Sequence, residues 1–205
     1  MIDLYAAPTT NGQRAKIMLD ETGLDYTLHR VNMQAREHKT PEFLAMNPMG
    51  QTPLIVDHDG PGGKAITIPQ SIAILFYLAE KSGKFLPQDP VARAAFWDPM
   101  MNSATDIGPT YGAVAFISRW SEENPAANEN FQQRFREYCA VWDVKLANQR
   151  YIAGDEVTIA DFSFFGIFHR AKSNYAAMAT GFTNLDCWHD EIHARPGVQK
   201  GLNFD

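Results

Sequence analysis

Cysteine is scarce in this sequence: only Cys139 and Cys187 occur among its 205 residues, and they are far apart. A disulfide framework needs more cysteines, and a structural zinc site needs closely spaced Cys and His ligands. We therefore expect neither a disulfide framework nor a metal site. A reducing, cytoplasmic setting fits this composition best.

Positive charge and long apolar runs are also lacking. The 18 Lys and Arg residues are scattered and are outnumbered by 24 Asp and Glu, which gives a formal charge of −6. This balance argues against nucleic acid and anionic membranes as partners. No run of 18 apolar residues occurs, and the start MIDLYAAP has no basic flank, so neither a membrane span nor an export signal is predicted.

Apolar periodicity is clear in the first part of the chain. A short alternating strand begins at Ile2, and a helix follows that ends at Gly23. After a second strand and a short helix, Pro53 precedes the apolar strand 54–56, and a Gly-Pro turn leads to a strand at 65–68. A helix then opens at Gln70-Ser71, so residues 1–83 read βαβαββα.

Beyond this α/β part, the sequence predicts only helices. Residues 84–89 have no periodicity, contain Pro87 and are followed by Pro90, which is typical of a linker. In the all-helical part, 90–205, Pro99 should kink or restart the first helix because a proline disfavours a helix interior. Thr158 and Asp161 have the spacing of a capping box, and we expect the last helix at 182–194.

Two places in the first part could hold a small acidic peptide. Pro53 keeps the preceding Thr52 extended, so the main chain of Thr52 could pair with an extended ligand. Ser71 supplies a hydroxyl at a helix start, where unpaired N–H groups and the helix dipole favour a carboxylate. Each of these signals alone is weak evidence for a ligand site. Their order and spacing in the chain together support a site for a small acidic peptide.

These segments carry a family resemblance over essentially the whole chain. The pattern Asn47 to Asp57, the pair Gln70-Ser71 and the Thr158-Ile-Ala-Asp-Phe box resemble those of cytosolic glutathione S-transferases. The opening, Ile2 to Gly12, is similar to that of the bacterial Nu class, which are glutathione-disulfide oxidoreductases. The resemblance implies a thioredoxin-like glutathione-binding domain at 1–83 and an all-helical domain at 90–205.

The resemblance also implies roles for individual residues. Pro53 matches a cis-proline, Gln70 and Ser71 match the pair that binds the γ-glutamyl end, and His38 stands where relatives contact the glycyl end. Arg134 matches an arginine that reaches glutathione disulfide. The residues implied to bind glutathione are His38, Gln51, Thr52, Pro53, Gln70, Ser71 and Arg134.

The chemical group is expected at the start of the first helix. A glutathione thiol becomes nucleophilic as the thiolate, so the site must supply hydrogen-bond donors and positive potential near the sulfur. Thr9 and Asn11 could supply these donors, and Thr10 is an alternative to Thr9 as the hydroxyl donor. Where thioredoxin-like redox proteins have C-x-x-C, this chain has Thr9 to Gly12, so the reactive sulfur must belong to glutathione.

Three functions stay open at this point. The bound thiolate could reduce a disulfide or a peroxide, or it could attack an electrophilic carbon of a small molecule and form a conjugate. The chain could instead be a non-catalytic binding or scaffold protein of the same fold. Family likeness alone suggests a homodimer.

Several other patterns favour structural explanations. His189 and His193, four residues apart, resemble a scrambled zinc-protease motif but are expected on a solvated helix face. Tyr5 is expected to be packed in its strand. The phenylalanines at 162–168 are expected in the core, and the candidates for an apolar acceptor wall are Tyr111, Phe116 and Trp120.

Overall fold

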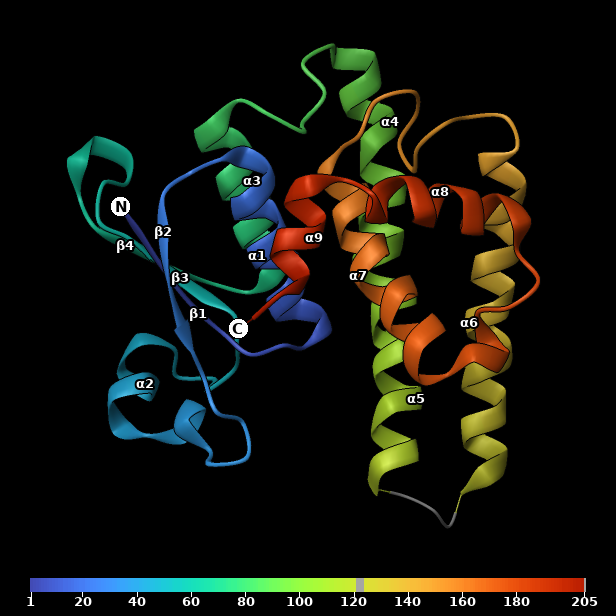
Figure 1. Ribbon diagram of the computed structural model, residues 1–205, viewed down its shortest axis with the longest axis horizontal. Helices are drawn as coiled ribbons and strands as arrows, with labels where there is room; N and C mark the ends of the chain where they lie inside the picture. Colours follow the sequence, from blue (N-terminus) through green and yellow to red (C-terminus); the bar gives the residue numbers. More distant parts are fainter. Residues whose placement is uncertain (121–123, 205) are drawn as a thin grey trace. The chain divides into compact units, whose positions relative to one another are not determined.

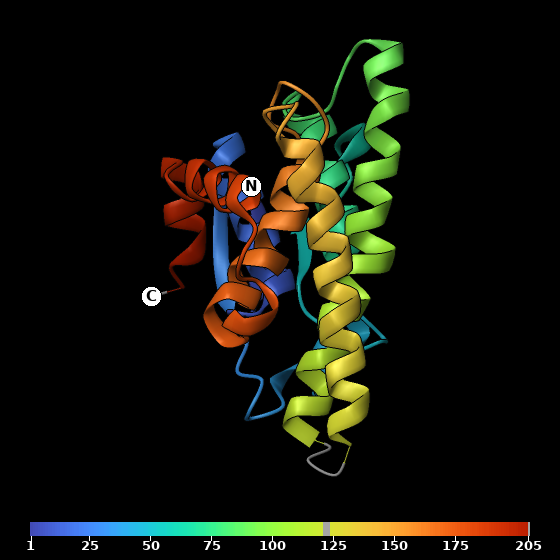
Figure 2. The ribbon, with the colours of Figure 1, turned by 90° about the vertical axis from the view of Figure 1, so that its right-hand side faces the viewer.

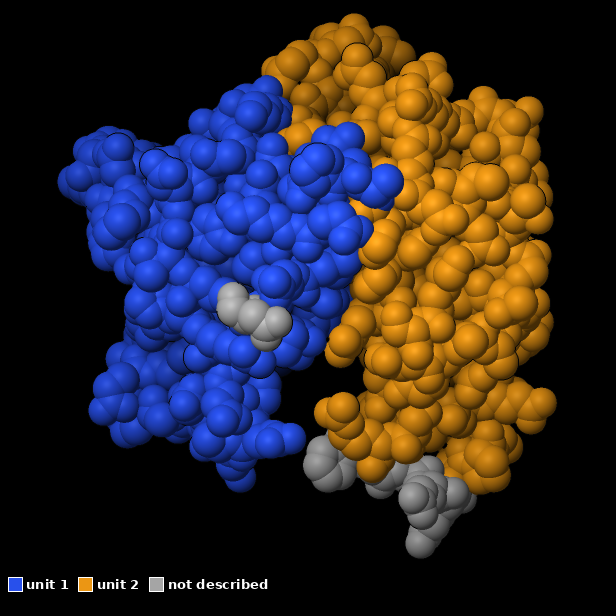
Figure 3. Space-filling model, viewed as in Figure 1, with its two compact units in different colours: residues 1–84, 194–205 blue, residues 85–193 orange. Residues whose placement is uncertain are grey.

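The computed structural model describes residues 1–120 and 124–204, with only the main chain at Trp120. The chain forms two compact units (Figure 3). Unit 1 comprises residues 1–84 and 194–205, and unit 2 comprises residues 85–193. The expected boundaries at 83 and 90 stay a prediction, but the contacts place the last twelve residues with unit 1 rather than with the helical part.

Unit 1 is built on a four-stranded mixed sheet (Figure 1). Its elements in chain order are β1 (Ile2–Ala6), α1 (Thr10–Thr22), β2 (Tyr26–Arg30), α2 (Pro41–Met46), β3 (Leu54–Asp57), β4 (Ile66–Pro69), α3 (Ser71–Ser82) and α9 (Pro196–Leu202). The strand order is β2-β1-β3-β4. β1 is parallel to β2 and antiparallel to β3, which is antiparallel to β4. The predicted order βαβαββα is confirmed.

The two faces of this sheet are covered by different helices. Ile2, Leu4 and Ala6 alternate with half-buried residues in β1 and are completely or almost completely buried. On the opposite face, Phe43 of α2 packs with Leu54, and Tyr5 packs against them. Helices α1 and α3 pack against each other, and α9 packs on α1 (Figure 1).

Unit 2 is helical throughout its described part. Its helices are α4 (Pro90–Met101), a π-helical segment (Asn102–Ile107), α5 (Gly108–Trp120), α6 (Pro125–Leu146), α7 (Ile159–Asn174) and α8 (Thr183–His193). Helices α5 and α6 run side by side (Figure 2). The fold class predicted from the sequence, a thioredoxin-like part followed by an all-helical part, is confirmed.

The helical part differs from expectation at the last helix, and in part at Pro99. Pro99 lies inside α4 without restarting it, between the completely buried Phe96 and Met100, and a kink at Pro99 stays a prediction. The hydrogen-bond pattern changes only afterwards, in the π-helical segment. The chain also continues past His193 into α9, because Pro196 occupies the first turn of a helix, where a proline is tolerated.

Capping residues position the helices of unit 2. The Thr158 hydroxyl accepts from the main chain of Ala160, and the buried Asp161 carboxylate accepts from the Thr158 N–H. Asp161 also accepts from Ile152 N–H and Trp188 Nε1, which ties α7 to α8. The phenylalanines 162, 164, 165 and 168 are fully buried, as expected. No helix of the described residues has both the length and the apolar character needed to cross a membrane.

Candidate active site

A cleft of about 390 Å³ opens in unit 1 where α1, α3 and the loop before β3 meet. Every site residue expected from the sequence contributes to its lining except Thr10 and Arg134. The lining residues are Thr9, Asn11, Met33, His38, Lys39, Asn47, Gly50, Gln51, Thr52, Pro53, Gln70 and Ser71.

Thr9 stands at the start of α1. It is the N-cap residue, in extended conformation, and its Oγ1 accepts a hydrogen bond from Gly12 N–H at 3.2 Å. A hydroxyl that accepts one bond still has its proton to donate. Gly12 is required here, because a Cβ would lie 2.0 Å from the Ala7 carbonyl oxygen. The helix start therefore carries a hydroxyl donor at the rim of the cleft.

Asn11 is oriented by its carboxamide oxygen. Asn11 Oδ1 accepts from Arg14 Nη1 at 2.9 Å and from Ser71 Oγ at 3.4 Å. With the oxygen engaged, the two N–H bonds of the amide remain as donors. Arg14 is buried, and burial lowers the pKa of its guanidinium to about 10, so it stays charged at neutral pH.

The loop before β3 is held by two polar side chains. Asn47 is buried, and its Nδ2 donates to the Gln51 carbonyl at 2.7 Å. Lys39 Nζ donates to the carbonyl oxygens of Met49 and Gly50, at 3.2 and 2.8 Å. This arrangement fixes the loop and leaves an ammonium group on the cleft wall.

Thr52 presents its main chain at the end of this loop. The Thr52–Pro53 peptide bond is cis, as the resemblance implied. Within the described residues the main-chain N–H and C=O of Thr52 make no hydrogen bond, and its hydroxyl lies 3.8 Å from Met33 Sδ. The main chain of Thr52 is therefore available to an extended ligand.

Gln70 and Ser71 form the start of α3. Gln70 has φ 75° and ψ 118°, a conformation that costs a non-glycine residue about 1–3 kcal/mol and that clusters at functional sites. Ser71 is the first residue of the helix and is 6% exposed. The first N–H groups of a helix have no partner within it, so this end of α3 can receive an anion.

His38 borders the cleft in a short 3-10 turn, Glu37–Lys39. Its Nδ1 atom is buried and has no hydrogen-bond partner in the described part of the chain. Partial burial, together with the charges of Lys39 and Arg36, lowers the pKa of His38. The lowered pKa means that the neutral ring predominates at pH 7, and one buried nitrogen of this ring is left without a bond among the described residues.

The other two expected site residues lie elsewhere. Thr10 is the first residue of α1 and is absent from the described lining of the cleft. Arg134 lies on α6 of unit 2, where it is exposed and donates from Nε to Tyr138 Oη at 2.9 Å. The roles of both residues stay predictions.

Sequence reasoning missed Arg14, Met33, Lys39 and Asn47. Asn47 and Lys39 could have been found from the sequence, since Asn47 begins the segment that carries the family resemblance and Lys39 lies next to the expected site residue His38. Of the expected acceptor wall, Tyr111 is buried, Phe116 is 65% exposed, and the side chain of Trp120 lies outside the described residues. Tyr5 is packed as expected and stacks on His29, with 4.5 Å between ring centroids.

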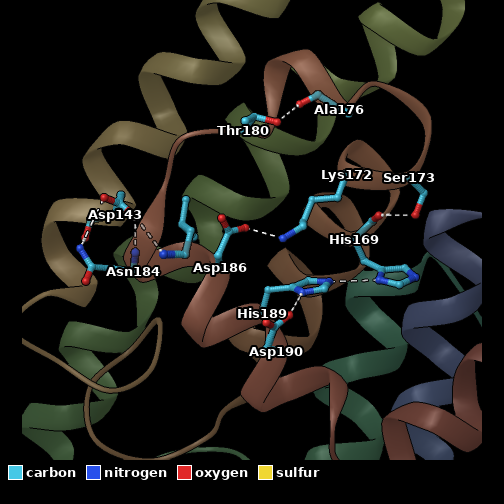
Figure 4. A network of polar contacts seen from close by, with 11 residues as sticks. Asp143, His169, Lys172, Ser173, Ala176, Thr180, Asn184, Asp186, His189 and Asp190 are labelled. Atoms are coloured by element: carbon cyan, nitrogen blue, oxygen red, sulfur yellow. Dashed lines mark hydrogen bonds and ion pairs between the residues drawn. The ribbon is translucent and has the colours of Figure 1, made fainter.

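The expectation of a solvated helix face is wrong for His189, while His193 is partly exposed. His189 is 7% exposed and packs against Phe165 of α7, and its Nε2 lies 3.1 Å from His169 Nδ1 (Figure 4). His193 is close to both, with ring centroids 5.4 and 5.7 Å away. Among the described residues no group of three or more His, Cys, Asp or Glu side chains is arranged to hold a metal ion.

Comparison with known proteins extends these observations to the whole chain. Residues 1–80 match the model for the glutathione S-transferase N-terminal domain, and residues 110–203 match a model for the C-terminal domain of the same family. The chain is 32% identical over 204 residues to the disulfide-bond oxidoreductase YfcG of Escherichia coli K12, with 98% of this chain and 94% of the relative covered. The chain belongs to the glutathione S-transferase family.

Other glutathione S-transferases are similar in sequence and structure. Disulfide-bond oxidoreductase YghU of E. coli K12 is 29% identical over 220 residues, covering 98% of this chain and 73% of YghU. A glutathione transferase of Pseudomonas putida, solved with one glutathione disulfide per subunit, has a TM-score of 0.93 at 31% identity and covers 99% and 91% of the two chains. A family member from Pseudomonas fluorescens, solved with two glutathione bound, has a TM-score of 0.89 at 34% identity, covering 98% and 92%.

Proposed function

We propose that this glutathione S-transferase family member binds glutathione in the cleft and uses its thiolate to reduce a disulfide or a peroxide. The observation that carries the proposal is the start of α1, where Thr9 and Asn11 offer donors but no cysteine is present. Of the two cysteines, Cys139 is fully buried and burial raises the pKa of its thiol, so it is a poor nucleophile. Cys187 is exposed but lies on α8 and is not among the lining residues of the cleft, so the reacting sulfur comes from glutathione.

Each end of the tripeptide has a complementary group in the cleft. The γ-glutamyl carboxylate would meet Ser71 and the free N–H groups of α3, and the cysteinyl main chain would pair with Thr52. The glycyl carboxylate would lie near His38 and the Lys39 ammonium. The sulfur would then face Thr9 Oγ1 and the Asn11 amide. Thr9 is favoured over Thr10 because Thr9 lines the cleft.

The reaction needs two glutathione molecules. The first thiolate attacks one sulfur of the substrate disulfide, forms a mixed disulfide and expels the other sulfur as a thiolate. A second glutathione thiolate attacks the mixed disulfide, which gives glutathione disulfide and the second thiol of the substrate. The names of the E. coli relatives and the bound glutathione disulfide of the P. putida protein support this chemistry over conjugation.

Activity measurements with matched variants test this function. We expect turnover of a small dialkyl disulfide with glutathione and none of a chloro-dinitrobenzene electrophile. Thr9→Val should reduce turnover roughly tenfold to a hundredfold, the effect of one hydrogen bond to a charged group, while Thr9→Ser retains it. Conjugation without disulfide reduction would contradict the proposal. A failure to bind glutathione in calorimetry would favour the non-catalytic binding or scaffold function.

A second copy of the chain is the proposed partner of unit 2. Large apolar side chains are exposed on α4 and α6: Val91, Trp97, Met101, Val141 and Val144. Lys145 of α6 pairs with Asp98 of α4 at 3.3 Å, and Trp142 Nε1 of α6 donates to Oδ1 of Asn102, the residue after α4, at 2.7 Å. Large apolar side chains exposed together are typical of a protein interface. We also propose a reducing compartment such as the cytoplasm, since both cysteines are free thiols.

A further inference from the structure

Arg14 is a buried cation directly beneath the start of α1. It is 4% exposed, and its Nη1 donates to Asn11 Oδ1 at 2.9 Å across one helical turn. Asn11 itself is exposed and lines the cleft. The charged group is thus withdrawn from solvent, while the residue it holds faces the ligand site.

The bond from Arg14 decides which way the Asn11 amide points. The oxygen and the nitrogen of a carboxamide point in different directions from the same carbon. When Arg14 binds the oxygen of Asn11, the two N–H bonds of the amide are therefore directed into the cleft. Ser71 Oγ also donates to Asn11 Oδ1, but at 3.4 Å this contact is long. A carboxylate bound at Ser71 would compete for that hydroxyl, and Arg14 would remain as the holder of the amide.

We infer that Arg14 is a positioning residue for the thiolate, which orients the Asn11 amide toward the glutathione sulfur. The inference rests on the proposed function and deepens it. Arg14 touches neither glutathione nor the second substrate in this role. It acts through Asn11, and its guanidinium fork can hold the amide oxygen in one orientation better than a lysine ammonium on a flexible stem.

The positive charge of the buried Arg14 would also stabilise a thiolate. Burial lowers the pKa of Arg14 only to about 10, so the guanidinium is a fixed positive charge over the pH range in which a thiol ionises. A nearby positive charge favours the anionic form of an ionising group such as a thiol. Loss of Arg14 should therefore raise the pKa of the bound thiol.

The experiment is a pH titration of the ultraviolet absorbance of glutathione thiolate bound to the protein. In Arg14→Met we expect the thiol pKa to rise by about one unit, while the calorimetric affinity for glutathione, measured below the thiol pKa of the natural chain, stays unchanged. Turnover should fall at neutral pH and recover at alkaline pH. Lys16→Met is the matched control, since Lys16 is also a buried cation of α1 but contacts Asp20 and the Lys200 carbonyl. It should leave the thiol pKa unchanged.

A double-mutant cycle tests whether Arg14 changes the thiol pKa through Asn11 or through its charge alone. It uses Arg14→Lys, which keeps the buried positive charge. Arg14→Lys should raise the thiol pKa by a smaller amount in the natural chain and not at all in an Asn11→Ala background. An unchanged thiol pKa in Arg14→Lys, or an equal rise in both backgrounds, would overturn the inference. If the natural chain bound no glutathione, the proposed function itself would fail, which is a distinguishable result.

Discussion

Ser71 combines two tasks that a single substitution can separate. Its N–H belongs to the helix start and is kept in Ser71→Ala, whereas its hydroxyl is the group that would bond a ligand carboxylate. Its contact with Asn11 also links the carboxylate end of the ligand to the sulfur end. The change in glutathione affinity on removing the hydroxyl therefore measures the contribution of the hydroxyl, without that of the N–H.

Ser71→Ala should weaken glutathione binding by roughly 1–3 kcal/mol, the loss expected for a charge-assisted hydrogen bond. Isothermal calorimetry measures this. Ser82→Ala is the control at the other end of α3, because its hydroxyl bonds the Leu78 carbonyl instead of a ligand. An unchanged affinity in Ser71→Ala would refute the carboxylate role.

His38 should make glutathione binding depend on pH. Its pKa in the free protein lies below the usual 6.5 or so, and a carboxylate bound beside it would raise that pKa. Binding then takes up a proton, so the affinity is highest below the free pKa and declines as the pH rises through the bound pKa. Calorimetry at several pH values should show this decline in the natural chain and a flat profile in His38→Gln. Equal profiles would exclude the contact.

Most single residues of the site could be predicted, and the exceptions share a cause. Thr9, Asn11, Thr52 and Ser71 carry local signals, because a cap, an extended residue before proline and a helix start are properties of short segments. Arg14 has none. A basic residue on an amphipathic helix is normally solvated, and its burial depends on how α1 packs within unit 1.

At the scale of elements, polar contacts tie α9 and the residues that flank it to the rest of unit 1. Lys16 Nζ donates to the Lys200 carbonyl at 2.7 Å, and Arg195 pairs with Glu21 at 2.6 Å. Arg30 donates to the Phe204 carbonyl at 3.2 Å. The sequence did not predict this helix, because it has only seven residues and begins at a proline that also fits the end of α8.

Gly201→Ala should destabilise unit 1. A Cβ at Gly201 would lie 2.5 Å from Ile17 Cα, which is main chain that cannot turn aside, so α9 must shift away from α1. We expect a loss of roughly 1–3 kcal/mol in the free energy of unfolding, measured by chemical denaturation, and weaker glutathione binding. Gly112→Ala is the control inside α5, where a Cβ meets nothing within 4 Å. It should stabilise the protein by about 0.5–1 kcal/mol. Equal stabilities would contradict the close packing.

The contact between α7 and α8 should weaken in acid. Burial, with the charges of His189, His193, Arg170 and Lys172, lowers the pKa of His169 to about 4, and burial also lowers that of His189 despite its bond to Asp190. The unfolded chain protonates these rings near pH 6.5, so it binds more protons than the folded chain between about pH 6.5 and 4.

Stability should accordingly fall as the pH falls through this window, by at most about 1.4 kcal/mol per pH unit for each such ring. Thermal unfolding of the natural chain and of His169→Phe, compared between pH 7 and pH 4, measures the effect. The variant should lose less stability, and an identical loss would show that His169 does not cause it. No sequence pattern joins His169 to His189, because they are twenty residues apart on different helices.

The whole molecule is expected to be a dimer through the exposed apolar side chains of α4 and α6. Val144 is 67% exposed and Val141 is 55% exposed on α6, beside the ion pair from Lys145 to α4. Val144→Glu should shift the protein to monomers by placing a charge in an apolar interface, as measured by sedimentation. Phe116→Glu, on α5, is the control at an exposed aromatic side chain and should stay dimeric. A monomeric natural chain would contradict the expected assembly.

The division of unit 1 between the two ends of the chain has a consequence for synthesis. Residues 1–84 are translated before residues 194–205, which include the helix α9 that packs on α1. Until α9 has been made, the side of α1 that receives it has no cover. A chain truncated at residue 193 would keep that side uncovered and open to chaperones and proteases.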